Sequence, residues 1–165
     1  NMHNSYVANM EANPHVYGAV NVALFEDEGY LTKIARDSQD LVLTFRNSHN
    51  WIRFGGIEQA YTSFNRVLKK GGVLGVVQHR AAPDADVKQA AEKGYIPQAY
   101  LIELVESMGF KLLAQSEINA NVKDTKDHSK GVWSLPPSYR EKDQNREKYR
   151  AIGETDRMTL RFVKL

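Results

Sequence analysis

The residues best suited to chemistry are polar side chains that directly follow apolar runs of the chain. Asn47, His49 and Asn50 follow the run at residues 40–45, and His79 follows a later run. Because an imidazole titrates near neutral pH, His79 is a candidate general base. The alternative for His79 is a hydrogen-bonded structural histidine. The alternative for the other three is a capped, solvated loop before a helix.

Two arginines and a tryptophan stand beside these residues. Arg46 could hold an anionic group, or it could form an ion pair with Asp40 or Glu26. Arg80 would suit an anionic substrate or a carboxylate, with a surface ion pair as the alternative. Trp51 could present an aromatic face to a cation or shape a pocket, and it could equally anchor the core.

A long polar stretch at residues 119–156 supplies further candidates. Loops of this length without regular structure are usually functional or disordered. Asn119 and Asn121 could contact a substrate from such a loop, and Trp133 and Leu135 would give it the apolar underside of a lid. A hairpin packed on the sheet edge is the alternative. The histidines of the chain show no metal-ligand spacing, so we expect no metal.

The elements that must position these side chains are strands separated by helices. Strands are expected at residues 20–25, 40–45, 73–77, 111–118 and 158–163. The first three of these segments are short apolar runs typical of buried strands. The last alternates apolar and polar residues, which is typical of an edge or half-exposed strand.

The clearest helix precedes the third of these strands. Six apolar residues form one stripe of helical period: Ile57, Ala60, Tyr61, Phe64, Val67 and Leu68. Lys69 suits the C-terminal end of the helix dipole, and Gly71 and Gly72 are expected to stop the helix in a left-handed conformation. A second helix is expected between Pro97 and Gly109.

Strands that alternate with helices predict an α/β fold with right-handed crossovers and a parallel sheet. In such sheets ligands bind beyond the carboxyl ends of the strands. The polar residues that follow the strands are therefore expected to meet at one edge of the sheet and to form the site.

Composition excludes several classes of protein. A chain of 165 residues with 42% hydrophobic and 25% charged residues is long enough for one globular domain. Its 22 basic and 20 acidic residues leave a net charge of +2, which favours neither nucleic acid nor an anionic membrane as a partner. The absence of cysteine excludes disulfides and thiolate sites. No apolar run approaches the ~20 residues of a membrane span. The compartment stays open: the cytoplasm is favoured, and the periplasm requires a signal ahead of residue 1.

Several segments resemble the second half of class I S-adenosylmethionine-dependent methyltransferases. "VLKKGGVLGVVQHRA" resembles that family's helix, glycine turn and fifth strand. "DLVLTFRNSHNW" resembles its fourth strand and following loop, and is similar to the "RN" segment of quinone-biosynthesis methyltransferases. More closely, five segments in order resemble a bacterial family of predicted methyltransferases with no assigned substrate: "TFRNSHNW", "GVVQHRA", "SEINANVKDTKD", "GVWSLPPS" and "AIGETDRMTLRFVK". This likeness covers residues 13–165.

The resemblance implies a Rossmann-like sheet that is mostly parallel, with an antiparallel last strand and the order 3-2-1-4-5-7-6. Strands 1 and 2 of that sheet, and the glycine-rich cofactor loop that follows strand 1, have no counterpart before residue 20. We therefore expect the C-terminal part of one domain. Residues 18–118 would form the sheet and helices, 119–156 a lid or insertion, and 157–165 the last strand. Strand 20–25 would stand two strand widths from its neighbour and leave an unpaired central edge.

The resemblance also implies roles for the candidate residues, with S-adenosylmethionine as the cofactor. The expected catalytic residues are His79, Asn47 and His49. The expected cofactor contacts are Glu26, Asp27, Phe45 and Arg46, although three consecutive acids are more often a solvated turn. The expected substrate contacts are Asn50, Trp51, Arg80, Asn119 and Asn121.

The function implied is transfer of a methyl group to a small-molecule acceptor whose identity the sequence does not contain. Because the glycine loop is missing, the 165-residue chain alone is expected to be inactive. The alternative is a non-catalytic Rossmann-like module for binding or interaction, and a nicotinamide oxidoreductase comes third. Neither nucleic acid nor a membrane is an expected partner, and a homodimer is left open.

Overall fold

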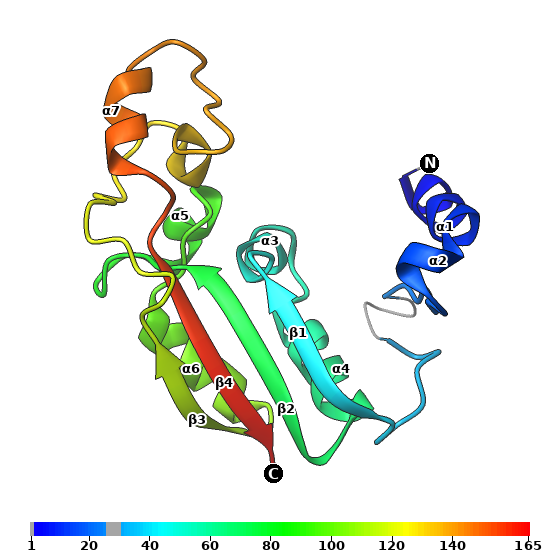
Figure 1. Ribbon diagram of the computed structural model, residues 1–165. Helices are drawn as coiled ribbons and strands as arrows, with labels where there is room; N and C mark the ends of the chain where they lie inside the picture. Colours follow the sequence, from blue (N-terminus) through cyan, green and yellow to red (C-terminus); the bar gives the residue numbers. More distant parts are fainter. Residues whose placement is uncertain (1, 26–30) are drawn as a thin grey trace.

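A four-stranded mixed sheet forms the centre of the protein. The computed structural model describes residues 2–25 and 31–165. The strands are β1 (Gln39–Phe45), β2 (Leu68–His79), β3 (Phe110–Ser116) and β4 (Arg157–Lys164), in the spatial order β1-β2-β4-β3 (Figure 1). β1 and β2 are parallel, and β4 is antiparallel to both β2 and β3. Three strands thus share one direction and only the last is reversed. The predicted fold class is confirmed, and the order agrees with the 4-5-7-6 half of the expected sheet.

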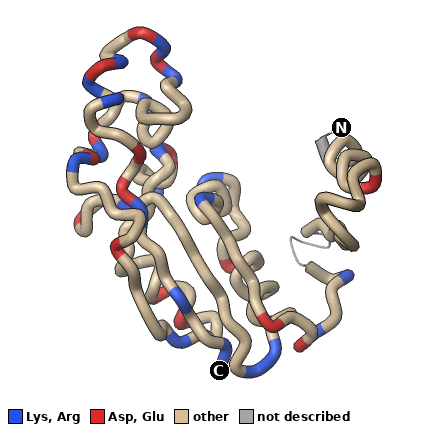
Figure 2. The backbone as a smooth tube through the Cα atoms, viewed as in Figure 1, with Lys and Arg blue, Asp and Glu red and all other residues tan. Residues whose placement is uncertain are grey.

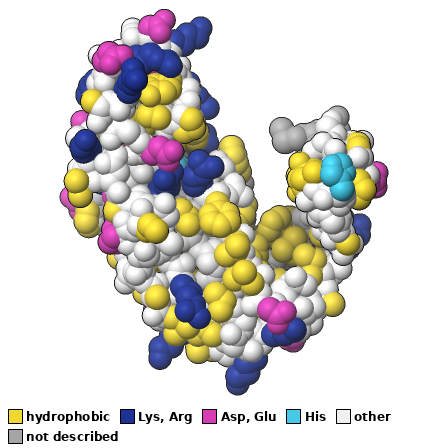
Figure 3. All heavy atoms as spheres, in the orientation of Figure 1, with side chains coloured by type: hydrophobic (Ala, Val, Ile, Leu, Met, Phe, Trp, Pro, Cys, Tyr) yellow, Lys and Arg dark blue, Asp and Glu magenta, His cyan; other side chains and the backbone are white. Residues whose placement is uncertain are grey.

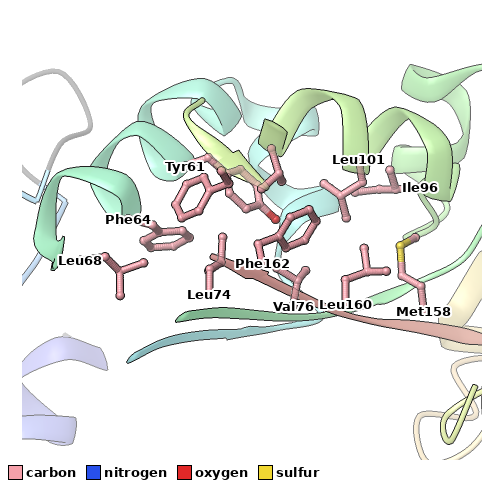
Figure 4. Packing of buried hydrophobic residues seen from close by; sticks show 12 residues of the cluster. Tyr61, Phe64, Leu68, Leu74, Val76, Ile96, Leu101, Met158, Leu160 and Phe162 are labelled. Atoms are coloured by element: carbon pink, nitrogen blue, oxygen red, sulfur yellow. The ribbon is translucent and has the colours of Figure 1, made fainter. Parts of the chain in front are cut away.

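Helices cover one face of this sheet. The two main ones are α4 (Ile57–Val67) and α6 (Gln98–Ser107). Twelve buried side chains from α4, α6 and the facing side of the strands form the main core, among them Tyr61, Leu101 and Phe162 (Figure 4). The stripe predicted from helical periodicity therefore does face the sheet.

The end of α4 differs from the prediction. The helix stops at Val67, and Leu68 is already extended and paired with Gln39 of β1. Lys69 therefore lies in β2, where its Nζ is 2.6 Å from Oδ1 of Asp40. Gly71 does have a positive φ of 79°, but it lies beyond the helix. Pairing with β1, rather than the glycines, ends the helix.

The strand predicted at residues 20–25 is wrong. These residues have no regular structure, and Val20, Leu24 and Phe25 are 42–47% exposed. Within the described part of the chain, β1 pairs only with β2, and residues 20–25 pair with no strand. Phe25 instead lays its ring 6.2 Å from the rings of Trp51 and Phe64. The segment therefore runs beside the helices rather than in the sheet.

Of the two alternatives for the last strand, the half-exposed strand is confirmed. β4 lies between β2 and β3, and its alternation buries Met158, Leu160 and Phe162 on one face. The predicted burial of β1, by contrast, is wrong. Leu41, Leu43 and Phe45 are 52%, 52% and 57% exposed. They belong to the uncovered face of the sheet, where hydrophobic side chains gather in Figure 3.

The remaining elements lie at the carboxyl ends of the strands or apart from the sheet. Near the strand ends are α3 (Ser48–Phe54), α5 (Val87–Glu92), the 3-10 helix η2 (Gly131–Ser134) and α7 (Arg146–Ile152). Two N-terminal helices, α1 (Met2–Ala12) and α2 (Pro14–Tyr17), lie apart from the sheet in Figure 1. Among the described residues, no helix is long and apolar enough to cross a membrane.

We call residues 119–156, which contain η2 and α7, the cap. Charged residues of both signs crowd this region, whereas the strands below carry few (Figure 2). The buried carboxylate of Asp124 holds the cap together. It accepts hydrogen bonds from the Tyr95 hydroxyl at 3.2 Å, from Nε2 of His128 at 2.9 Å and from the backbone N–H of Asp156 at 2.8 Å. The predicted long polar connection is therefore ordered by internal polar contacts.

Candidate functional site

A pocket of about 330 Å³ lies where the carboxyl ends of β1 and β2 meet the cap. It is lined by Phe45, Arg46, His49, Asn50, His79, Val132, Trp133, Pro136, Pro137, Ser138, Thr155 and Arg157. These residues come from both strand ends, from α3, from the cap and from the start of β4. The position is the one expected for ligands of an α/β sheet.

The short helix α3 brings His49 into the pocket. Its N-terminus is fixed from within, because the hydroxyl of Ser48 is 2.8 Å from the hydroxyl of the buried Tyr61. Asn47 precedes the helix, and its Oδ1 accepts a hydrogen bond from Nδ2 of Asn50 at 2.9 Å. The loop between β1 and α3 is therefore held by its own side chains, and His49 is 3% exposed.

The Gln78 side chain determines the protonation of His49. Its amide nitrogen donates to the carbonyl oxygen of Gly94 at 2.9 Å and lies 3.2 Å from Nδ1 of His49. An amide nitrogen can only donate, so Nδ1 of His49 accepts, and the neutral ring carries its proton on Nε2. Burial lowers the pKa of His49. His49 is therefore a neutral hydrogen-bond donor at the pocket wall.

His79 is the second imidazole of the pocket. Its ring centroid is 5.9 Å from that of His49, and its Nδ1 is 2.6 Å from Oγ1 of Thr155. Burial, followed by repulsion from His49, Arg157 and Arg46, lowers the pKa of His79 to about 3. His79 is therefore neutral at physiological pH and, with the pocket as it stands, a weak base.

Two arginines give the pocket a positive potential. Arg46 lines it from the end of β1, and Arg157 lines it from the start of β4. Arg157 pairs with Glu154 at 2.5 Å, but its Nε is buried and has no hydrogen-bond partner among the described residues. No carboxylate belongs to the pocket lining. The site is therefore suited to a group that is negatively charged or rich in hydrogen-bond acceptors.

Solved structures with the same fold are known. A putative sarcosine dimethylglycine methyltransferase from Galdieria sulphuraria has a TM-score of 0.57 at 14% identity, over 94% of this chain and 64% of that one. The cyclase SpnF has a TM-score of 0.54 at 16% identity, over 97% and 60%. A SAM-dependent methyltransferase from Methanosarcina mazei has a TM-score of 0.52 at 11% identity, over 85% and 65%.

The chain has a methyltransferase-like Rossmann fold. It spans only 60–65% of the length of these three structures. At 11–16% identity the likeness concerns the fold alone, and the cyclase among them illustrates that a fold does not determine a reaction. No protein-family model and no curated protein sequence matches the chain.

Within this fold, five of the predicted site residues lie together in the pocket. They are Phe45, Arg46, His49, Asn50 and His79. Asn47 lies directly behind them through its bond to Asn50. Asn119 lines an adjoining hollow of about 260 Å³ with Phe45, Arg46 and Arg157. The carboxyl ends of parallel strands thus collect these side chains as the sequence suggests, and their roles stay predictions.

Three other predicted residues are engaged elsewhere. Trp51 packs its ring 5.6–6.2 Å from the rings of Phe25, Tyr61 and Phe64, which is the core position given above as the alternative. Asn121 donates through Nδ2 to the carbonyl oxygens of Ile152 and Glu154 at 2.9 and 2.5 Å, inside the cap. Arg80 pairs with Asp156 and Glu117. None of the three lines the pocket, so a direct substrate contact by any of them needs a different arrangement.

Arg80 is the centre of an ion-pair network. Its guanidinium donates from Nε and Nη2 to the two carboxylate oxygens of Asp156 at 3.1 and 2.9 Å. It also donates from Nη1 and Nη2 to Glu117 at 3.0 and 2.6 Å. This geometry ties the end of β2 to the chain after β3 and to the segment before β4. Arg80 therefore positions the strand ends around the pocket.

The remaining predictions concern two acidic residues and the absence of a metal site. Glu26 and Asp27 lie outside the described residues. Among residues 2–25 and 31–165 no group of three or more potential metal ligands comes together. Conversely, sequence reasoning missed Thr155 and Arg157. A signal existed, since β4 was expected to run antiparallel, and the residues at its start then lie beside the carboxyl ends of the other strands.

Proposed function

We propose that this chain carries the acceptor-binding side of an S-adenosylmethionine-dependent methyltransferase. The observation that supports it most is the pocket at the carboxyl ends of β1 and β2, in a sheet of order β1-β2-β4-β3 with one reversed strand. A volume of about 330 Å³ matches a small molecule. The cap would close over the acceptor, with Trp133, Pro136 and Pro137 as its underside.

The acceptor would be held by groups of both kinds, charged and neutral. Arg46 and Arg157 favour an acidic or oxygen-rich acceptor, because no carboxylate belongs to the lining and only Arg157 is paired, with Glu154. His49 can donate from Nε2 to an acceptor oxygen. Asn47 would act through Asn50, by fixing the loop that carries both. Positioning of this kind accounts for much of the acceleration of a two-substrate reaction.

His79 would hold or accept the acceptor's proton. Burial, and then repulsion from His49, Arg157 and Arg46, lowers its pKa to about 3 and makes it a weak base. A negatively charged acceptor between the arginines would offset their repulsion and raise the pKa of His79. Burial would persist, so His79 would become a stronger base without regaining its ordinary pKa. Thr155 keeps the ring oriented through its contact with Nδ1.

S-adenosylmethionine supplies an activated methyl group on its sulfonium. The described residues fit one part of this cofactor, since Arg46 is suited to its carboxylate. Within residues 2–25 and 31–165 no strand ends in a glycine-rich loop. In a methyltransferase of this fold, the cofactor loop would lie on strands that pair with the free edge of β1, next to the exposed Leu41, Leu43 and Phe45.

Binding of the cofactor tests this proposal. Calorimetric titration with S-adenosylmethionine and its demethylated product should reveal an affinity of about 100 µM or tighter in the protein expressed from its natural gene. The 165-residue chain alone should bind neither, and micromolar affinity there would contradict the placement of the loop. Absence of binding by the natural protein would overturn the methyltransferase proposal itself. With an acceptor in hand, His79→Asn should lower kcat more than it changes KM.

The second candidate is a non-catalytic binding module that uses the same pocket. The low pKa of His79 favours it, because a base this weak adds little to proton transfer. Two measurements distinguish the candidates. The binding module is supported if a ligand binds in the pocket, if Arg46→Ala abolishes that binding, and if no methyl group is transferred to the ligand from labelled cofactor.

A further inference from the structure

A second hollow, of about 260 Å³, adjoins the pocket on the other side of Trp133. It is lined by Arg53, Glu92, Lys93, Ser129, Lys130, Trp133 and Arg140. These residues come from the end of α3, the end of α5 and the cap. Three segments that are distant in the sequence thus build one concavity, and Trp133 is a wall of both spaces.

The charges of this hollow are unbalanced. Four of its seven lining residues are cations and only Glu92 is an anion. Nε of Arg53 pairs with Glu92 at 3.1 Å. In the described part of the chain, no carboxylate oxygen lies within 4.0 Å of the charged nitrogens of Lys93, Lys130 or Arg140. A concave wall focuses such a field on its interior. The whole chain has a net charge of only +2, so this excess is local.

A carboxylate that contacts the lining residue Ser129 is already engaged. Glu141 lies outside the lining, and its carboxylate accepts hydrogen bonds from the hydroxyls of Ser129, Ser134 and Tyr149. It attracts Lys130 without pairing with it. Glu141 therefore orders the floor of the hollow and leaves Lys130 with its three donors.

Trp133 fixes the two guanidinium groups. The Cζ atom of Arg140 is 4.8 Å from the centroid of the indole, and that of Arg53 is 5.7 Å away. Cation–π stacking uses the face of a guanidinium and leaves the N–H groups on its edge available. No hydrogen bond from the Arg140 side chain is formed within the described residues, so its five donors remain. A fork of this kind matches an oxyanion.

We propose that the hollow behind Trp133 is a binding site for a phosphate group, carried by a small phosphorylated molecule. Three cations without an ion pair, one of them the guanidinium fork of Arg140, suit a dianionic phosphate better than a singly charged carboxylate. Ser129 and the indole border the same space, so an aromatic or sugar body of the ligand can rest against Trp133. The site does not depend on methyl transfer.

Tryptophan fluorescence tests the proposal on the chain itself. The protein has two tryptophans, and Trp51→Phe leaves Trp133 as the only reporter. An oxyanion that draws Arg140 from the indole should change its emission. Titration with inorganic phosphate and with phenyl phosphate at constant ionic strength should give a saturable change below about 1 mM, which calorimetry should reproduce. Phenyl phosphate should bind more tightly if the indole contributes.

Matched variants separate a built site from general ionic attraction. Arg140→Gln and Lys93→Gln should each weaken phosphate binding about tenfold, the size expected for one charged hydrogen bond. Arg150→Gln is the control: it removes the same charge from a side chain on α7 that is 74% exposed and does not line the hollow. Equal weakening in all three variants would overturn the proposal, as would no saturation up to about 10 mM by either method. Acetate binding as tight as phosphate binding would overturn the assignment to phosphate. Because no cofactor is needed, these outcomes are independent of the methyltransferase proposal.

Discussion

The helix-covered face of the sheet and the cap above it are both well buried, but by different interactions. Beneath α4 and α6, the buried side chains Leu101, Val105 and Phe162 are apolar and carry no hydrogen bonds to satisfy. In the cap, Asp124 and His128 are 2% and 3% exposed, and each needs a specific partner. The first kind of burial depends on area and shape, and the second on individual hydrogen bonds. The pocket lies at the junction, so its walls should respond to both kinds of change.

Removal of a core ring should have the largest effect. Phe162→Ala empties a fully buried position between α6 and the sheet, and should lower the free energy of unfolding by about 3–5 kcal/mol. The whole domain should unfold together, with the denaturant dependence unchanged. Val163→Ala, on the uncovered face of the same strand, is the control and should cost about 1 kcal/mol or less. Similar losses for both variants would show that the two faces are not distinct.

Neutralising the buried carboxylate of the cap should act locally. Asp124→Asn places an amide nitrogen among donors and should destabilise the cap by about 2–3 kcal/mol. Hydrogen exchange should become faster in residues 119–156 and stay slow in β2 and β4. Asp127→Asn, whose carboxylate is 77% exposed in the same loop, should leave exchange unchanged. If hydrogen exchange in β2 and β4 became faster by the same factor as in residues 119–156, the cap and the core would unfold as one unit.

The neutral imidazoles at the junction have an effect that depends on pH. Burial lowers the pKa of His79 from 6.5 to about 3. Between these two pH values, His79 is protonated in the unfolded chain and neutral in the folded chain. Stability should therefore fall as the pH drops from 6.5 toward 3, by at most about 1.4 kcal/mol per pH unit for one histidine. His49 acts in the same direction.

The measurement for this effect is urea unfolding at several pH values between 6.5 and 4.5. His79→Asn should make the curve of stability against pH flatter, because the substituted chain no longer gains that proton on unfolding. An unchanged slope would show that His79 is protonated in the folded state, and the neutral pocket wall would then be wrong.

Much of this could be predicted because it is local. The apolar period of residues 57–68 requires an amphipathic helix, and α4 follows it to within one residue. Polar residues after apolar runs had to meet at one edge once the runs became parallel strands, which brought His49 and His79 together. The resemblance added the reversed last strand. Sequence alone therefore determined the two main helices, the four strands of the sheet, the fold class and the edge of the sheet at which the pocket lies.

Only the tertiary structure decided which strands pair and which side chains meet. Residues 20–25 have the composition of a strand, but a strand needs a neighbour for its N–H and C=O groups, and among the described residues this segment pairs with none. β4 has the alternation of an edge strand yet lies inside the sheet, because alternation reports which face is buried and not how many neighbours a strand has. The contact of His79 with Thr155 joins residues 76 positions apart. Local sequence determines periodicity, whereas the partners, burial and pKa values that define the pocket arise only when distant segments meet.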